Sequence, residues 1–75
     1  MTLTLDQLQP GQSASVIDLL SRDPARLDRL SGYGLVPGSA VELRQHQPAL
    51  IVRVGETEIS LDSAVAREIL VQPTL

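Results

Sequence analysis

Apolar and polar residues alternate along much of the chain, and this period of two is typical of half-buried strands. Ala14 and Val16 fall on one face of a predicted strand over residues 12–19. Further runs of the same kind predict strands over 40–45, 49–54, 57–61 and 68–72. The pattern therefore indicates a mainly β protein of about five strands.

Turn and cap residues separate these runs. Thr4 and Gln7 have the spacing of a capping box, which predicts a single helical turn near the start. Pro10 and Gly11 follow and predict a type II turn, because proline sets the first corner and glycine accepts a positive φ at the second.

Residues 22–34, RDPARLDRLSGYG, predict one short helix between the first and second long strands. Asp23 is a good N-cap, and Pro24 occupies the first helical position, where its missing N–H is not needed. Gly32 or Gly34 is expected to end the helix in the left-handed region.

Asp62 is expected to cap a helical turn that ends at Ala66, and Pro73 to end the pairing of the last strand. Five short strands in 75 residues make a marginal open sheet, whereas a curled sheet shares one core and loses its edges. We therefore expect one domain over residues 1–75. It should be a small, SH3-like, mostly antiparallel barrel with a short helix after the first strand and a helical turn before the last.

Charge and composition narrow the function. The chain carries a net charge of −3, has no lysine, and spreads its six arginines along the sequence. Nucleic acid and anionic membranes select clustered basic residues, so neither is expected as a partner. The longest apolar run, residues 49–52, is too short for a membrane span. No charged segment followed by an apolar stretch is visible in the sequence, so no secretory signal is expected. A cytoplasmic location is expected.

The stretch LSGYGLVPG resembles an anion-binding loop only in its glycine content. Gly32 and Gly34 follow a predicted helix, where carbonyl groups and the negative end of the dipole lie, so a helix stop is favoured over an anion cradle. Tyr33 is the single aromatic residue. Its side chain either packs, partly buried, against the end of the barrel or is exposed and contacts a partner. Because aromatic residues and arginines anchor interfaces, the residues that we expect to bind a partner are Arg26, Arg29, Leu30, Tyr33 and Leu35.

Metal, cofactor and catalytic sites are not predicted. His46 is the single histidine, and its strand neighbours Glu42 and Glu58 make a poor ligand set by spacing, so a solvated hairpin histidine is favoured. There is no cysteine, no serine in a nucleophile motif and no evident base, so no enzymatic activity is expected.

Three blocks taken in order are similar to the FeoA family, which includes ferrous iron transport protein A and the matching C-terminal domains of iron-dependent repressors. The blocks are Leu-x-Pro-Gly at residues 8–11, Arg-Leu…Gly-Leu-x-Pro-Gly at residues 29–38, and a close formed by Leu61, Ala66, Ile69 and Val71. Tyr33 stands where many members have methionine, and Asp62 where many have arginine. The resemblance covers nearly the whole chain.

The resemblance implies a cytoplasmic accessory protein of ferrous iron uptake, which docks on the membrane GTPase-permease of that system. An alternative is a regulatory domain that acts with a metal-dependent transcriptional repressor. Met1 stands directly before the domain, which favours a stand-alone chain over a fused repressor. An aliphatic barrel edge and exposed arginines leave assembly into a small homo-oligomer open.

Overall fold

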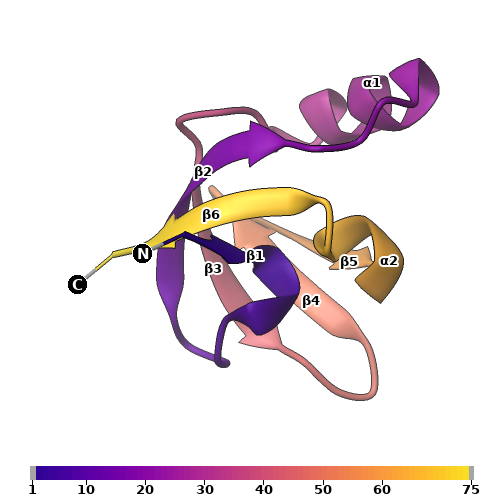
Figure 1. Cartoon of the computed structure of the whole chain (residues 1–75). Coiled ribbons are helices and arrows are strands. Elements are labelled where there is room, and N and C mark those ends of the chain that lie inside the picture. Colours follow the sequence, from indigo (N-terminus) through magenta and orange to yellow (C-terminus); the bar gives the residue numbers. More distant parts are fainter. Residues whose placement is uncertain (1, 75) are drawn as a thin grey trace.

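The computed structural model describes residues 2–74 and contains six strands, two short α-helices and one 3-10 turn (Figure 1). In chain order these are β1 (Leu3–Thr4), η1 (Leu5–Gln7), β2 (Ser13–Leu19), α1 (Pro24–Gly32), β3 (Ala40–Gln45), β4 (Leu50–Val54), β5 (Thr57–Leu61), α2 (Ser63–Ala66) and β6 (Ile69–Pro73). The predicted positions of the long strands, the inserted helix and the final helical turn are confirmed.

One antiparallel sheet contains all six strands, in the order β1-β6-β2-β3-β4-β5. The sheet has one strand more than the approximately five that the pattern predicts: β1 has only two residues and pairs Leu3 with Val71, far along the chain. So short a strand has no alternation of its own. Its pairing partner, and not its local sequence, makes it extended.

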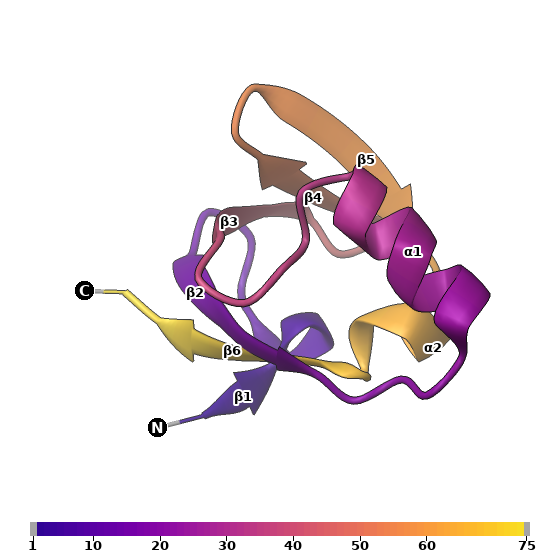
Figure 2. The same cartoon turned by 90° about the horizontal axis from the view of Figure 1, so that it is seen from above.

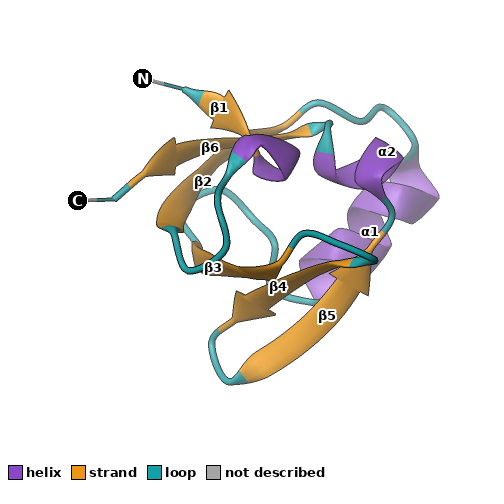
Figure 3. Ribbon diagram, turned by 90° about the horizontal axis from the view of Figure 1, so that it is seen from below, coloured by secondary structure: helices purple, strands orange, loops and turns teal. Residues whose placement is uncertain are grey.

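The sheet curls until it encloses its core, as Figure 3 shows from below. The mainly β, antiparallel prediction is confirmed, but the hydrogen-bonded barrel does not close. Among residues 2–74, β1 and β5 end the strand order without pairing with each other. The sheet therefore has two edges, at β1 and β5, which a closed barrel would not have.

Among residues 2–74 the hydrophobic core consists of aliphatic side chains from the inner face of the sheet, from the turns that cap it, and from Leu30 of α1 and Ala66 of α2. The largest fully buried side chains are Leu5, Leu8, Leu35, Leu43, Val52, Ile69 and Val71. Ala14 and Val16 of β2 are buried as their alternation predicts. The register between β2 and β6 shifts after Val16, so Ile17 has no partner in the ladder. Such a shift is a β-bulge, which bends the strand, and here the side chain of Ile17 is 40% exposed.

Two Pro-Gly turns have the same geometry. The N–H of Gln12 donates to the carbonyl of Gln9 at 2.9 Å, with Pro10 and Gly11 (φ +89°) at the corners. The N–H of Ser39 donates in the same way to the carbonyl of Val36 at 3.0 Å. A positive φ at the second corner is characteristic of a type II turn, so the type II turn predicted at Pro10 and Gly11 is confirmed.

The capping box predicted at Thr4 and Gln7 is present, whereas the prediction that Pro73 ends the pairing of the last strand is wrong. The side-chain oxygen of Gln7 accepts from the N–H of Thr4 at 3.0 Å, while the hydroxyl of Thr4 donates to the carboxylate of Asp6. At the other end Pro73 does not stop the pairing, because it lies opposite Ala14 and the N–H of Thr74 still donates to Ser13 at 2.9 Å. Proline fits here because the ladder does not use its nitrogen.

Candidate functional site

The inserted helix α1 begins where the sequence predicts. The carboxylate of Asp23 accepts from the N–H of Ala25 at 3.0 Å, and Pro24 is the first helical residue. Both features satisfy the start of a helix that is only nine residues long. Figure 2 shows α1 outside the sheet, beside β5 and α2.

The end of α1 explains the glycine pair. Gly32 lies inside the helix, Tyr33 is the C-cap at φ −82°, and Gly34 takes the positive φ of +91°. The N–H of Gly34 donates to Ser31 at 3.0 Å and the N–H of Leu35 donates to Leu30 at 2.9 Å. These two bonds form a Schellman motif. Gly34 and not Gly32 is therefore the glycine that the backbone requires.

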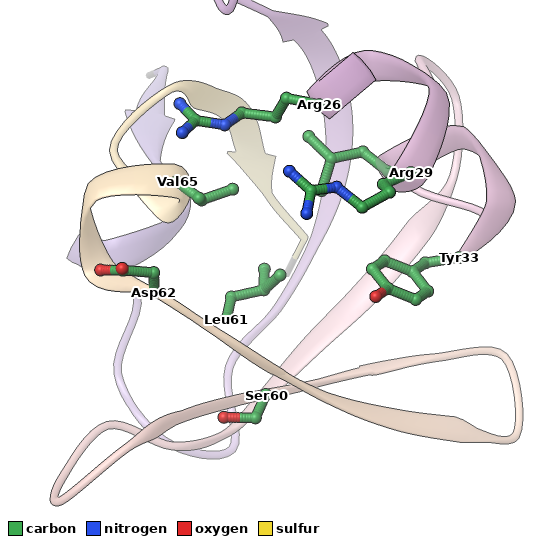
Figure 4. Close-up of a pocket in the computed structure, with 8 residues that line it drawn as sticks. Arg26, Arg29, Tyr33, Ser60, Leu61, Asp62 and Val65 are labelled. Carbon is green, nitrogen blue, oxygen red and sulfur yellow. The ribbon is translucent and has the colours of Figure 1, made fainter.

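A pocket of about 290 Å³ opens between α1 and the region where β5 runs into α2 (Figure 4). One wall comes from α1 and its C-cap: Arg26, Arg29, Leu30 and Tyr33. The facing wall comes from the end of β5, the α2 cap and α2: Ser60, Leu61, Asp62 and Val65. The two walls are about thirty residues apart in sequence.

The two arginines of the pocket are held differently. Nη1 of Arg26 lies 2.7 Å from a carboxylate oxygen of Glu68, and both side chains are about one third exposed. The Nε of Arg26 is buried and makes no hydrogen bond among the described residues. Arg29 is exposed, and within residues 2–74 it forms none of the ion pairs. Figure 4 shows its guanidinium extending from α1 toward the pocket.

Four of the five residues predicted to bind a partner thus meet in one place. Tyr33 is 47% exposed at the rim, which supports an exposed contact over packing against the end of the barrel, and Leu30 lies at the base. Leu35 is a correction. It is fully buried, because the Schellman motif turns it into the core beside Leu30. Its role is structural, and it does not line the pocket.

The facing wall was not predicted from the sequence. Asp62 was assigned only as an N-cap, which it is, since its carboxylate accepts from the N–H of Ala64 at 3.2 Å. Nothing in the local sequence of Ser60, Asp62 or Val65 indicates that the three side chains line one pocket.

His46 differs from its prediction as a solvated histidine. It is half-buried, and its Nε2 lies 2.7 Å from the backbone carbonyl of Asp6. A carbonyl only accepts, so Nε2 carries the hydrogen. Glu42 and Glu58 instead flank Arg44 at 3.2 Å each. Among residues 2–74, no three histidine, cysteine or acidic side chains gather as metal ligands.

The same described range has no helix with the length and apolar character needed to cross a bilayer. A family model described as the FeoA domain matches residues 3–73. The chain belongs to the FeoA family. This membership supports a role in ferrous iron transport, as the resemblance implied, and the role of a small accessory protein.

Solved structures agree with this FeoA assignment. A crystal structure of an iron uptake regulatory protein (FeoA) has a TM-score of 0.90 at 22% identity, over 99% of this chain and 100% of that chain. FeoA of Stenotrophomonas maltophilia, crystallised with zinc and described as an SH3 domain protein, has a TM-score of 0.82 at 29% identity, over 93% and 89%. The SH3-like fold is thereby confirmed.

The FeoA fold also occurs in a repressor. IdeR of T. acidophilum has a TM-score of 0.90 at 20% identity, over 97% of this chain but only 34% of the repressor. At that identity the likeness shows the fold alone. No curated protein sequence matches this FeoA-family chain.

Proposed function

We propose that the chain acts in ferrous iron uptake by docking on the cytoplasmic region of the membrane GTPase-permease, through the surface around the α1–β5 pocket. The observation that carries the proposal is the convergence of Arg26, Arg29 and Tyr33 on one pocket in a member of the FeoA family. Arginine and aromatic side chains over an apolar base are the usual anchors of protein interfaces. Docking there would place the chain in the cytoplasm.

The geometry of α1 supports this use. Its two ends are fixed by the Asp23 cap and by the Schellman motif at Gly34, and the buried side chain of Leu30 anchors it to the core. Tyr33 and Arg29 are exposed from this fixed frame. A rigid frame lowers the entropic cost of binding, because few groups must be ordered when a partner arrives.

The test is a calorimetric titration of the chain against the purified cytoplasmic region of the permease, with GDP, with a non-hydrolysable GTP analogue and without nucleotide. We expect saturable binding in at least one state. Tyr33→Ala and Arg29→Ala should each weaken it about fivefold or more, as loss of an interface anchor does. Arg22→Ala, an exposed arginine outside the pocket, is the matched control and should leave affinity unchanged.

Two outcomes contradict the proposal in different ways. Absence of binding at high micromolar concentration in every nucleotide state would exclude docking on this region of the permease. Binding that is equally strong in all three variants would retain the partner but move the contact to another face. The repressor-associated alternative has support from the fold alone and no observation of this chain favours it.

A further inference from the structure

The outer edge of β5 is open beside the pocket. β5 pairs only with β4, across the two-residue turn Gly55–Glu56, so Val54 and Thr57 close the hairpin. In an antiparallel pair alternate residues bond to the partner strand, which turns the N–H and C=O groups of Glu58 and Ser60 to the other side. No backbone hydrogen bond within residues 2–74 uses those groups.

An open strand edge is a template for another strand, and proteins protect such edges when they have no use for them. Proline, a bulge and charged side chains are the common protections. Over residues 57–61 β5 has no proline and no bulge, and its one charged residue, Glu58, is paired with Arg44. Ser60 belongs both to this edge and to the pocket wall. The edge and the pocket therefore form one continuous surface.

The pocket is positive on the side of α1. Arg29 has no ion-pair partner within the described chain, and Arg26 has a buried Nε that makes no hydrogen bond. Asp62 lies on the facing wall, away from both guanidinium groups (Figure 4). A carboxylate bound beside Arg29 would gain a charge-assisted hydrogen bond, which is stronger than a neutral one.

The base of the pocket is aliphatic, with Leu30, Leu61 and Val65. Its volume of about 290 Å³ is at the lower limit of small-molecule sites, which span roughly 300–1,000 Å³. That space suits one aliphatic side chain of a longer ligand better than a cofactor. The long, open edge of β5 supplies the rest of the contact.

We infer that this surface binds an extended acidic segment of a partner protein, which adds to β5 as a further strand. Its backbone bonds to Glu58 and Ser60, one carboxylate meets Arg29, and one aliphatic side chain enters the pocket. Backbone pairing gives such a complex affinity and the pocket gives it specificity. The inference deepens the proposed docking function and rests on it for the partner being a protein.

The first test uses a probe that does not depend on the permease. A fluorescein-labelled hexapeptide is titrated against the whole chain, beside a control peptide with glutamine for each glutamate. The acidic peptide carries a glutamate and a valine two positions apart, so that both side chains lie on the same face of an added strand and can reach the one pocket. The acidic peptide should bind at least about tenfold more tightly, since hydrogen bonds to charged groups exceed neutral ones by that amount. Equal affinity for the two peptides would overturn the inference.

Substitutions of single charged residues test whether the acidic peptide binds at the pocket. Arg29→Glu should weaken the acidic peptide by about tenfold or more, whereas Arg22→Glu, the same change outside the pocket, should not. Asp62→Asn should tighten it by about twofold or more, because asparagine preserves the cap and removes a repelling carboxylate. An effect of Arg22→Glu as large as that of Arg29→Glu would mean non-specific attraction and overturn the site.

The pairing with β5 is tested by amide hydrogen exchange. Exchange at Glu58 and Ser60 should slow by about tenfold or more when the acidic peptide is bound, while the paired residue Ile59 changes little. Ser60→Pro should abolish binding, and Ser60→Ala, which keeps the N–H, should preserve it. Peptide binding without slower exchange at both amides would exclude strand addition.

The two proposals fail separately. If the permease region binds the chain and Arg29→Glu has no effect, the acidic-segment inference is wrong, and docking on the permease stands but through another face. If the acidic peptide binds and the permease region does not, the docking proposal is wrong and the inference stands. Sedimentation of the chain alone tests whether the edge of β5 is instead covered by a second copy of the chain. A dimer that the acidic peptide dissociates would assign the edge to a second copy and overturn the inference.

Discussion

The sheet and the inserted helix are held in opposite ways. Strand β2 pairs with β6 on one side and with β3 on the other, and the sheet buries Leu43 and Val71 completely. Helix α1 has one fully buried anchor, Leu30, together with caps at both ends and one ion pair to the strand side at Glu68. Figure 1 shows the helix lying clear of the sheet.

Because of this difference, the sheet determines the stability of the protein, while the exposed face of α1 determines what it can bind. A substitution in the sheet acts on the fold, because every inner side chain touches others. A substitution on the exposed face of α1 acts on what the protein can bind, because Arg29 and Tyr33 project from a frame that the backbone fixes independently. The predictions below test that separation, from the largest expected effect to the smallest.

Leu43→Ala should have the largest effect. Leu43 is fully buried, and removing such a leucine costs about 2–5 kcal/mol of unfolding free energy. At about 0.05–0.15 kcal/mol per residue, a domain of 75 residues has about 4–11 kcal/mol in total, so this variant should lose a large share of its stability. Urea unfolding followed by circular dichroism measures the loss. Leu20→Ala, with a side chain that is 48% exposed, should stay within about 0.5 kcal/mol of the parent.

Gly34→Ala should have the next largest effect. An alanine there would adopt φ +91°, and its Cβ would lie 3.3 Å from Cγ1 of Val54. The expected loss is about 1–2 kcal/mol in thermal or urea unfolding. Gly32→Ala is the matched control: Gly32 is helical with open space around it, so alanine should stabilise by about 0.5–1 kcal/mol. Losses of equal size would contradict the assignment of Gly34 as the helix stop.

Breaking the Arg26–Glu68 pair should cost less than about 1 kcal/mol, since both side chains are about one third exposed and solvent screens the pair. The measurement is a double-mutant cycle of Arg26→Met and Glu68→Gln in urea. A coupling energy of 0.2–1 kcal/mol is the usual range for such pairs, and about 0.5 M salt should reduce it. A coupling above about 2 kcal/mol would show that the helix depends on the pair.

Tyr33→Ala should have the smallest effect on stability, within about 0.5 kcal/mol of the parent by thermal unfolding. The backbone of Tyr33 forms the C-cap, while its side chain is 47% exposed. The same variant should weaken partner binding in the titration above. A destabilisation above about 1 kcal/mol would show that the ring packs as part of the fold, and the separation drawn here would fail at this residue.

Local chemistry predicted most of the fold. Asp23, Asp62, Pro10-Gly11 and the alternating runs each act within a few residues, and each is found as expected. The missed features need partners far along the chain. β1 exists because Leu3 meets Val71, and His46 is bound by a carbonyl forty positions away. No local pattern contains that information.

The candidate site was half predictable for the same reason. Arg26, Arg29 and Tyr33 share one helix and its cap, so helical spacing brought them together from the sequence. The opposite wall, with Ser60 and Asp62, is placed by the path of the hairpin and of α2. Leu35 was misassigned because its burial follows from the handedness of Gly34, which apolar spacing does not show.

The position of β6 in the sheet affects how the protein folds during translation. The strand over residues 69–73 lies between β1 and β2 in the sheet, although it is the last of the six to be synthesised. During translation β1 has no neighbour and β2 has an exposed edge until this segment leaves the ribosome. Contacts between such distant segments form slowly. The domain therefore completes its fold only when residues 69–73 have left the ribosome, and it is most exposed to aggregation just before that moment.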